Sequence, residues 1–407
     1  MINPKNWKQT TLGEVSKAVD YGYTQSASYD PIGPKFLRIT DIQDDFIDWS
    51  KVPFCEISEK DHKKYKLEVG DVVVARTGNS TGATATMKDK SIDAVFASYL
   101  IRFRLDSAVI DFRFVDFLVR SKNWSAFVKS IKGGSAQAGV NAKQLSLFPI
   151  DLPPLDDQRS IAAVLSSLDD KIEILRAQNK TLEEMAQRLF KEWFVDFNFP
   201  NEDGKPYKKS GGRMIGSEMG EIPEGWRIGR IYEVLKVQYG FAFKSPFFNQ
   251  SNEGFPLIRI RDLKSGSPAV YTTQNFPSDY LVNEGDILAG MDAEFKPVIW
   301  SGKKGGLNQR VCKFSPLGSV GRFFVLEFIR PFLHFFENTK YGTTVSHLGK
   351  SDLDSIEAVI PESRILDLFS QVSTPLYEKV VVNQSAIFSL ALSRDTLLPK
   401  LMSGEIL

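Results

Sequence analysis

An internal repeat constrains the fold of this chain more than any other feature, because related segments recur in the same order. The opening PKNWKQTTLGEV (4–15) returns as PEGWRIGRIYEV (223–234), with the same Trp and the same Glu-Val close. The turn YGY that begins at Tyr21 returns as YGF at Tyr239. Three further segments recur, namely LRITDI (37–42) as IRIRDL (258–263), VGDVVV (69–74) as EGDILA (284–289), and GSAQAGVNAKQL (134–145) as GTTVSHLGKSDL (342–353). The sequence therefore predicts two copies of one fold.

Each copy is predicted to contain a mixed α/β body followed by a long helix. A chain of 407 residues is too long for a single hydrophobic core. Runs such as GDVVVART and FASYLIRFRL have the composition of strands, whereas VDFLVRSKNWSAFVKSI has helical spacing. The predicted parts are body 1 (1–153), a central helix (154–200), a linker (201–222), body 2 (223–361) and a C-terminal helix (362–407).

The composition is that of an ordinary globular protein, with 42% hydrophobic and 25% charged residues. No apolar run reaches the roughly 18 residues of a membrane span, and the first residues lack the apolar core of a signal peptide. Cys55 and Cys312 lie far apart, so we expect no disulfide scaffold and a cytoplasmic, reducing location. Because the formal net charge is +1, any DNA-binding surface must be charged locally rather than globally.

The central helix carries an apolar seam with alternating spacings of four and three, which is a heptad pattern. Its members are Ile161, Leu165, Leu168, Ile172, Leu175, Asn179, Leu182, Ala186, Leu189 and Trp193. Asn179 is the one amide among them. The acids that follow LPPL suit a helix N-terminus, so this helix is predicted over residues 156–194, roughly 55–60 Å at 1.5 Å per residue.

The C-terminal helix is predicted to be less regular because it contains two prolines. We expect Pro375 to start or kink this helix, with Ser373 or Thr374 as its cap, and Pro399 to end it.

Common catalytic patterns are missing from the sequence. His62, His334 and His347 do not cluster with the two cysteines, so a metal site is not expected. HLGKS lacks the first glycine of a phosphate-binding loop, and no Asn-Pro-Pro-aromatic tetrapeptide of an amino-methyltransferase occurs. Asp203 and Lys205 form the Asp-x-Lys pair of some nucleases, but no preceding strand holds them, which favours a solvated turn. The chain is predicted to bind no cofactor and to lack catalytic activity of its own.

Polar, basic and glycine-punctuated loops occur at equivalent places in both bodies. Arg and Lys match the guanine edge, Asn and Gln match the adenine edge, and glycine allows close approach to phosphates. A single surface Arg or Asn is usually only solvated, so the prediction depends on clustering in both copies. The candidate DNA-binding residues of body 1 are Tyr21, Tyr23, Arg38, Arg76, Thr77, Asn79, Ser80, Thr81, Lys132, Ser135, Gln137 and Asn141. Those of body 2 are Tyr239, Lys244, Arg259, Arg261, Lys303, Lys304, Asn308, Gln309, Arg310, Tyr341, Thr343, Thr344 and His347.

These features resemble the specificity (S) subunit of type I restriction-modification systems. The matching motifs are the duplicated W…LGEV openings, the GD[IV] strands, LNQRV (307–311), LPPLDDQRSIAAVLSSLDDKIE, PYKKSGGRMIGSEMGEIPEGW and LLPKLMSGEI. The resemblance covers the whole chain. It implies an α+β fold with two pseudo-repeated mixed α/β target-recognition domains, separated by a long antiparallel helix pair that acts as a coiled-coil spacer.

The resemblance also implies the function and the partners. Each recognition domain would read one half of a bipartite, asymmetric sequence in double-stranded DNA. The helices would dock two modification subunits, which carry S-adenosylmethionine and methylate adenine. Restriction subunits, which use ATP and Mg²⁺ for translocation and cleavage, would join to form the endonuclease.

One segment of body 2 departs from the family pattern. ILAGMDAEFKPVIW stands where the family commonly has a glycine-rich turn, so Asp292 and Glu294 place negative charge near the expected DNA. A carboxylate can accept from a cytosine amino group, or the loop can turn away from DNA. The sequence leaves both alternatives open.

The heptad seams predict a register for the antiparallel helix pair. The seam of the C-terminal helix is Phe369, Ser373, Leu376, Val380, Asn383, Ile387, Leu390, Arg394, Leu397 and Leu401. Pairing Asn179 with Asn383 places every central layer apolar against apolar, with Leu168 opposite Arg394 farther out. An Asn buried against an aliphatic residue would lose hydrogen bonds worth roughly 1–3 kcal/mol, which favours the amide pair. The alternative is that Asn179 contacts a modification subunit or a water molecule.

A rigid helix pair would act as a ruler between half-sites. A spacer of roughly 50 Å corresponds to on the order of 15 base pairs at 3.4 Å per pair.

Two other function classes remain possible from the sequence alone. One is a DNA-acting enzyme, either a nuclease or a drifted methyltransferase, and the other is a scaffold that binds DNA without specificity.

Overall fold

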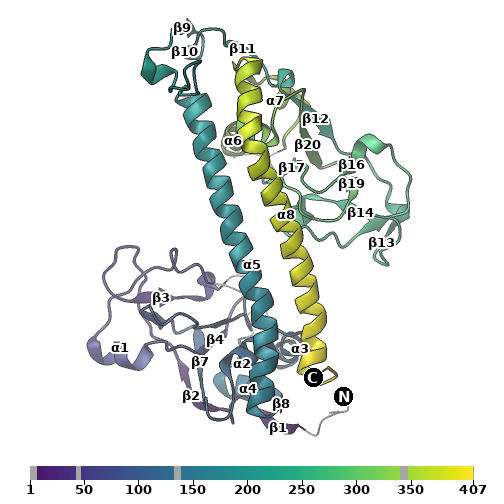
Figure 1. Cartoon of the computed structure of the whole chain (residues 1–407). Helices are drawn as coiled ribbons and strands as arrows, with labels where there is room; N and C mark the ends of the chain where they lie inside the picture. Colours follow the sequence, from purple (N-terminus) through teal and green to yellow (C-terminus); the bar gives the residue numbers. More distant parts are fainter. Residues whose placement is uncertain (1–6, 43–46, 133–138, 340–346, 407) are drawn as a thin grey trace. The chain divides into compact units, whose positions relative to one another are not determined.

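The computed structural model describes residues 7–42, 47–132, 139–339 and 347–406. The chain divides into two compact units. The first contains residues 1–170 and 391–407, and the second contains residues 171–390. The long helices α5 (Leu155–Phe190) and α8 (Ser363–Met402) each contribute residues to both units and pack together (Figure 1). The fold is α+β, as predicted.

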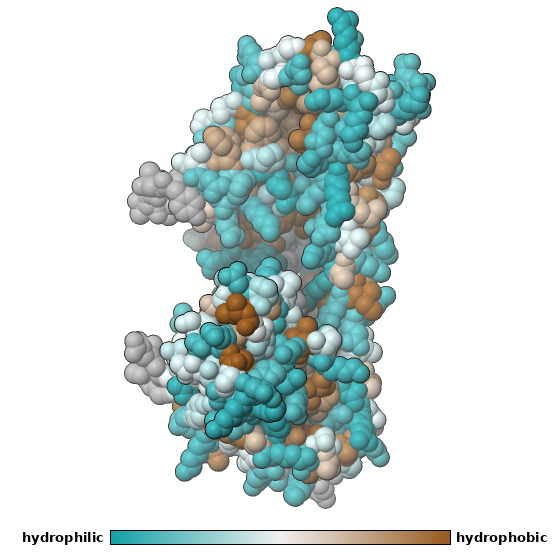
Figure 2. Space-filling model, turned by 90° about the vertical axis from the view of Figure 1, so that its left-hand side faces the viewer, coloured by the Kyte–Doolittle hydropathy of each residue, from teal (hydrophilic) through white to brown (hydrophobic). Residues whose placement is uncertain are grey.

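Exposed apolar side chains are dispersed over the surface. The face drawn in Figure 2 is mostly hydrophilic, with hydrophobic residues in small separate patches. In the part of the chain that the structure describes, no helix combines the length and the apolar composition needed to cross a bilayer.

Body 1 is organised around a four-stranded antiparallel sheet in the order β2-β7-β4-β5. Its strands are β1 (Lys8–Thr11), β2 (Ser16–Tyr21), β3 (Lys35–Leu37), β4 (Val72–Ala75), β5 (Thr84–Thr86), β6 (Ala94–Phe96), β7 (Leu100–Leu105) and β8 (Pro149–Leu152). Its helices are α1 (Glu59–Tyr65), α2 (Phe112–Leu118), α3 (Lys122–Ile131) and α4 (Ala142–Ser146). All four residues of β4 are buried because the strand is covered on both faces. Strands β3 and β6 pair in parallel, and β1 pairs with β8.

Body 2 repeats this topology. Its four-stranded sheet has the order β12-β20-β17-β18, which matches the order in body 1. These strands are β12 (Leu235–Tyr239), β17 (Ile287–Gly290), β18 (Val298–Ile299) and β20 (Val311–Pro316). A second sheet contains β13 (Phe248–Asn249), β14 (Phe255–Ile258), β15 (Tyr271–Thr272), β16 (Leu281–Val282) and β19 (Gly305–Leu307). Strand β11 (Arg227–Arg230) pairs with β21 (Glu357–Ile360), as β1 pairs with β8. The helices are α6 (Arg322–Thr339) and α7 (Lys350–Asp354).

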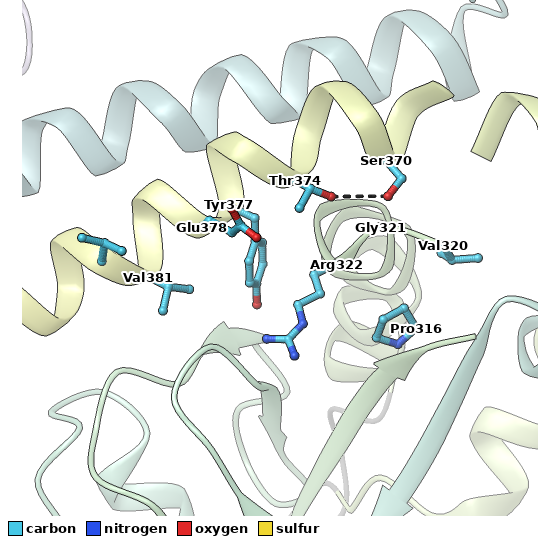
Figure 3. Close-up of a pocket in the computed structure, with 10 residues that line it drawn as sticks. Pro316, Val320, Gly321, Arg322, Ser370, Thr374, Tyr377, Glu378 and Val381 are labelled. Carbon is cyan, nitrogen blue, oxygen red and sulfur yellow. Dashed lines mark hydrogen bonds between the residues drawn. The ribbon is translucent and has the colours of Figure 1, made fainter. Parts of the chain in front are cut away.

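A cavity of about 620 Å³ lies in unit 2 between the start of α6 and the adjacent face of α8 (Figure 3). Arg322 and Tyr377 line it, and both donate to the carbonyl oxygen of Gly285, at 2.8 and 2.7 Å. Burial raises the pKa of the Tyr377 hydroxyl, and the nearby Arg322 opposes this effect only in part. Tyr377 therefore stays a neutral donor that ties α8 to the turn before β17.

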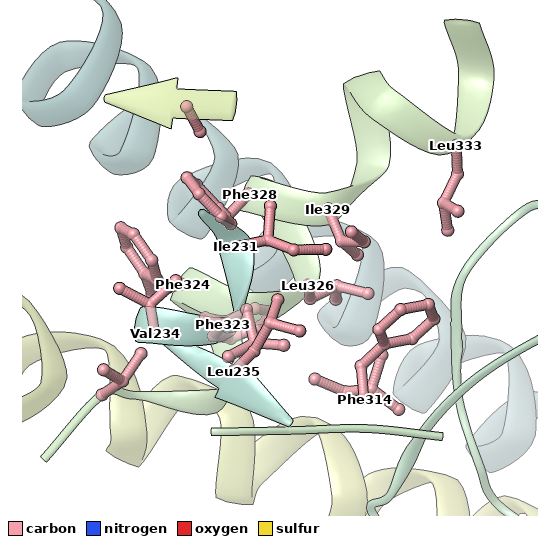
Figure 4. Packing of buried hydrophobic residues seen from close by; sticks show 14 of the residues in the cluster. Ile231, Val234, Leu235, Phe314, Phe323, Phe324, Leu326, Phe328, Ile329 and Leu333 are labelled. Atoms are coloured by element: carbon pink, nitrogen blue, oxygen red, sulfur yellow. The ribbon is translucent and has the colours of Figure 1, made fainter. Parts of the chain in front are cut away.

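The core of body 2 is unusually aromatic. Helix α6 places Phe323 and Phe324 in a cluster with Val234 and Leu235, and Figure 4 shows these side chains packed together. Just beyond the end of α5, Trp193 enters the same cluster, and its ring centroid lies 5.6 Å from that of Phe369 on α8. The aromatic end of α5 is thus buried against the body that follows it in sequence.

The opening tryptophan of each body packs in an equivalent way. In unit 2, Trp226 stacks on Phe199, with centroids 5.1 Å apart and an interplanar angle of 18°. In unit 1, Trp7 lies against the backbone at Gly404, just beyond α8. Each tryptophan therefore covers the chain that leaves one of the long helices.

Three sequence-based expectations of local structure differ from the observed elements. Pro375 does not start a helix, neither Ser373 nor Thr374 caps one, and Pro399 does not end one, because α8 is continuous from Ser363 to Met402. A proline within a helix loses one backbone hydrogen bond, but burial of the neighbouring Ser373 and Tyr377 in the helix pair and in the core keeps the helix intact. The segment predicted as one helical run is divided between α2 and α3, because Ser121 caps α3 by accepting from the amide of Trp124. The region predicted as a linker contains a hairpin of β9 (Met214–Ser217) and β10 (Gly220–Pro223).

Candidate nucleic-acid interface

The Tyr-Gly turns fix how the loops of the two bodies correspond. Gly22 lies against the carbonyl of Ala97, and Gly240 lies against the carbonyl of Asn308, so neither position has room for a side chain. The residue after each glycine forms the same hydrogen bond, from Tyr23 N to Phe96 O and from Phe241 N to Leu307 O, both at 2.8 Å. These contacts make the loop at 97–99 structurally equivalent to the loop at 308–310.

A second pair of hydrogen bonds extends this correspondence. Arg76 N donates to Tyr99 O at 3.0 Å, and Met291 N donates to Arg310 O at 2.9 Å. The carbonyl of Arg76 accepts from Val140 N, and that of Met291 accepts from Leu348 N. Tyr99 is therefore the counterpart of Arg310, a relation that the sequence analysis missed. Its ring is 55% exposed at the start of the central strand β7, and the alignment of FASYL with LNQRV could have revealed it.

In body 1, several predicted residues lie near this loop. The guanidinium carbon of Arg76 lies 5.0 Å from the ring centroid of Tyr21, in a cation–π arrangement. The Tyr21 hydroxyl accepts from the amide of Ala142, next to Asn141. Asn141 itself caps α4 by accepting from Gln144 N at 2.9 Å. The turn residues Thr77, Asn79, Ser80 and Thr81 follow Arg76 directly, and Thr81 closes that turn by donating to the carbonyl of Gly78.

Two predicted arginines have an evident structural role. Arg38 donates from Nε and Nη2 to the carboxylate of Asp41, and Arg259 makes the same pair of bonds to Asp262. In each case the arginine backbone N–H also donates to that aspartate, so the side chain closes a short turn. The paired Nε and Nη2 donors that would suit a base edge are therefore already bonded to a carboxylate.

In body 2, the acidic departure from the family pattern meets two predicted residues. Asp292 Oδ1 lies 2.7 Å from His347 Nδ1 and 3.6 Å from Arg310 Nη1. Phe295, three residues beyond Asp292, is fully buried and anchors the loop, whereas Glu294 is exposed. The Asp292 carboxylate is thus partly neutralised by Arg310, while Glu294 faces solvent.

The other predicted residues differ in exposure. Lys132, Lys244, Arg261, Lys303, Lys304 and Gln309 are exposed on loops or loop edges. Asn308 is half-buried beside Gly240. Tyr23 and Tyr239 pack partly against hydrophobic clusters, and burial raises the pKa of the Tyr239 hydroxyl. Ser135, Gln137, Tyr341, Thr343 and Thr344 lie outside the described residues.

The interface offers hydrogen-bond donors and positive charge. Within the described ranges, no group of three His, Cys, Asp or Glu side chains is arranged to hold a metal ion. Burial raises the pKa of the Cys55 thiol to about 11 and that of the Cys312 thiol to about 12, so both remain protonated at neutral pH. Asp203 and Lys205 lie 3.9 Å apart on an exposed turn. Hydrogen-bond donors and positive charge on these loops suit the recognition of DNA, whose phosphates are negative and whose base edges carry hydrogen-bonding groups.

The two seam amides are hydrogen bonded to each other. Asn383 Nδ2 donates to Asn179 Oδ1 at 2.8 Å, and Asn179 Nδ2 donates to the carbonyl of Val380 at 3.3 Å. Their side chains are buried, with 7% of Asn179 and 1% of Asn383 exposed. This is the pairing that the heptad argument predicts, and no seam residue of either helix is exposed.

A partly buried ionic cluster joins the two helices in unit 1. Arg394 Nη1 on α8 donates to Asp169 Oδ1 on α5 at 2.8 Å, so Arg394 is paired rather than directed to solvent. Arg120, which follows α2, donates to Asp169 Oδ2 at 3.0 Å. Burial alone would raise the pKa of Asp169, but the two guanidiniums outweigh it and hold the pKa below its usual value.

Comparisons with known proteins agree with this architecture. A family model described as the type I restriction modification DNA specificity domain matches residues 4–184 and 223–377. The chain is 31% identical over 308 residues to the MjaIX type I restriction enzyme specificity subunit of Methanocaldococcus jannaschii, covering 71% of this chain and 68% of that protein. It is 23% identical over 477 residues to the HindI specificity subunit of Haemophilus influenzae, covering 98% and 100%.

A solved structure has the same fold. The crystal structure of a type I restriction-modification S subunit from M. genitalium matches with a TM-score of 0.59 at 12% identity, covering 98% of this chain and 97% of that one. The two segments that the family model matches coincide with the two copies of the repeat. The chain therefore belongs to the type I restriction-modification DNA specificity (S) subunits, the non-catalytic subunits that recognise the DNA target.

Proposed function

We propose that each body reads one half of a bipartite, asymmetric target in double-stranded DNA. The observation that carries this proposal is the pair of equivalent loops, which have the same backbone hydrogen bonds but present Tyr99 in body 1 and Arg310 in body 2. Loops of fixed backbone with different side chains are suited to different base sequences. Two bodies in one chain would therefore specify two unlike half-sites.

The helix pair is proposed to set the distance between the half-sites. The Asn179–Asn383 bond lies on the seam, and the Arg394–Asp169 ion pair lies one residue from the expected Leu168 layer, so both fit an antiparallel pairing of the two helices. A polar pair in an apolar seam specifies register, because a shifted pairing would leave both amides unsatisfied. Inserting one heptad into both helices is expected to lengthen the preferred spacer while leaving each half-site unchanged.

The helices are also proposed to dock two modification subunits. Away from the seam, α5 exposes Ile174 and Met185, and α8 exposes Val372, Val382 and Leu392, each at least half exposed. Apolar residues on the outer surface of a helix pair suit a protein partner. S-adenosylmethionine, ATP and Mg²⁺ are then expected on the modification and restriction subunits, and this chain is expected to bind no cofactor itself.

The decisive experiment maps methylated adenines in DNA from cells that carry the complete system. The expected result is one bipartite motif with a fixed spacer, which the heptad insertion lengthens. Purified chain alone, given S-adenosylmethionine or Mg²⁺, should neither methylate nor cleave DNA. A specificity ratio near one for all duplexes at fixed salt would contradict sequence recognition and would favour a nonspecific scaffold.

A further inference from the structure

We propose that Arg310 reads a guanine in the half-site of body 2, and that Asp292 is the positioning residue that holds its guanidinium, with His347 hydrogen bonded to the Asp292 carboxylate. This inference rests on the proposed function, because it assigns a role within the half-site that body 2 is proposed to bind.

The backbone of Arg310 is fixed from several sides. Arg310 directly precedes β20, which is an inner strand of the four-stranded sheet. Its carbonyl accepts from Met291 N, and two residues earlier Asn308 is packed against Gly240. A side chain that extends from such a fixed backbone lies in a reproducible place, which is what reading one base pair requires.

The Asp292 carboxylate holds both neighbours through a single oxygen. A carboxylate only accepts hydrogen bonds, so at 2.7 Å the Nδ1 atom of His347 carries the proton and donates it to Asp292 Oδ1. Arg310 Nη1 lies 3.6 Å from the same oxygen and 3.4 Å from His347 Nδ1. The charge of Asp292 therefore attracts the Nη1 side of the guanidinium and leaves the other pair of donors, Nε and Nη2, unbonded within the part of the chain that the structure describes.

The paired Nε and Nη2 donors of Arg310, which form a planar fork, remain available to a base. Its side chain is 53% exposed, and among the described residues its Nε and Nη2 atoms make no hydrogen bond. Guanine presents two acceptors, N7 and O6, to which a guanidinium donates two bonds in the major groove. In Arg38 and Arg259 the same Nε and Nη2 atoms are bonded to an aspartate, so these residues are less suited to this contact.

The other exposed cations of body 2 lack one of these properties. Lys303 and Lys304 carry compact ammonium charges without a rigid planar pair of donors, so they match the two acceptors of guanine less selectively than a guanidinium does. Arg261 is exposed, and in the described part of the chain no carboxylate lies within ion-pair distance to orient it. An unanchored arginine loses side-chain entropy on ordering, which makes it a weaker discriminator of bases.

Body 1 does not have the arrangement of Arg310, Asp292 and His347 at the equivalent place. Tyr99 replaces Arg310, and the shared hydrogen bonds place Thr77 at the position of Asp292 and Gly139 at that of His347. A tyrosine hydroxyl donates one hydrogen bond, so it cannot make the paired contact to guanine. The half-site of body 1 is therefore expected to lack a guanine contact of this kind.

The test uses the full-length chain assembled with its modification subunits. Binding is measured on duplexes in which each base pair of the mapped target is substituted in turn. Arg310→Ala is expected to lower discrimination by about 5- to 150-fold at one G·C pair of the second half-site, and to leave the first half-site unchanged. Arg310→Lys keeps the charge but not the fork, so it should lose the same discrimination while keeping the salt dependence of binding.

Two further variants test the positioning role and the selectivity. Asp292→Asn should weaken discrimination at that same base pair, and the double variant with Arg310→Ala should be no worse than Arg310→Ala alone, because both changes remove one interaction. The matched control in body 1 is Tyr99→Ala, which should alter only the first half-site. Thermal unfolding of each variant verifies that it is folded.

Several results would overturn the proposal. One is unchanged discrimination at every position in Arg310→Ala. Another is a uniform loss of affinity with the salt slope reduced by about one, which would make Arg310 a phosphate contact. Both outcomes leave DNA specificity intact, whereas an unmutated assembly without any sequence preference would refute the proposed function instead.

Discussion

The amide pair Asn179–Asn383 allows a sharp test of how the helix pair is specified. Replacing Asn383 by Leu removes the donor that satisfies Asn179 Oδ1 at 2.8 Å. Because only 7% of Asn179 is exposed, water cannot readily replace the lost bond. An unsatisfied buried acceptor costs about 1–3 kcal/mol, so Asn383→Leu should be destabilising by that amount.

The double variant Asn179→Leu/Asn383→Leu reverses the expectation. With both amides removed, no polar group of this pair is left unsatisfied, and leucines, which have the same number of side-chain heavy atoms as asparagine, extend the apolar seam. Replacing both partners of a buried polar contact is often neutral or stabilising. The register, however, loses its polar determinant, so the assembled system should methylate sites with more than one spacer length.

The assay is thermal unfolding of the full-length chain, combined with methylation mapping in cells. For a domain of this size, 1 kcal/mol shifts Tm by about 2–4 °C, so the single variant should melt about 2–12 °C lower. The double variant should melt at or above the temperature of the unmodified chain. A single variant as stable as the unmodified chain, or a double variant less stable than the single one, would refute the reasoning.

Three further predictions concern the turns, the ionic cluster and the helix proline. Gly240→Ala should be destabilising by about 1–3 kcal/mol and weaken DNA binding, because a side chain collides with the Asn308 carbonyl. Gly216→Ala, which meets nothing within 4 Å, is the matched control in the same denaturation and binding assays. Because the pKa of Asp169 is lowered by folding, its ion pairs stabilise the chain fully above the unfolded pKa of about 4, and this contribution is lost as the pH falls through the lower folded value. Asp169→Asn should therefore flatten the fall of Tm as the pH is lowered below about 4, and an unchanged profile would contradict this role. Pro375→Ala should stabilise α8 by up to about 3 kcal/mol, measured as a rise in Tm, because Pro375 is exposed within a continuous helix.

The repeat and the heptad seam allowed much of the fold to be predicted. Both depend on patterns that survive without knowledge of tertiary contacts: the order of segments, and the period of apolar residues along a helix. The pairing of Asn179 with Asn383 followed because polar residues in two otherwise apolar seams must face each other. Pro375 and Pro399 lie within α8 because local propensity is a weak determinant where one face of a helix is packed in tertiary contacts.

The candidate site was predictable in outline but not in detail. Arg38 and Arg259 were chosen for their residue type, yet the aspartate three positions later, present in both LRITDI and IRIRDL, indicates a side chain that closes its own turn. Tyr99 was missed because a tyrosine and an arginine share no chemistry that marks them as equivalent. Their equivalence is evident from backbone hydrogen bonds across the sheet, and in the sequence only from the alignment of FASYL with LNQRV.

The acidic segment of body 2 shows why charge alone is a poor guide to a DNA interface. Taken by itself, Asp292 would repel phosphates, and the sequence left open whether it reads cytosine or turns away. The structure places Asp292 against Arg310 and His347, so its negative charge interacts with groups of the protein itself. A carboxylate that orients a guanidinium restricts that side chain before DNA arrives, which lowers the entropy lost on binding. A negative residue can in this way increase selectivity for a guanine while contributing little repulsion, because the ion pair as a whole is neutral.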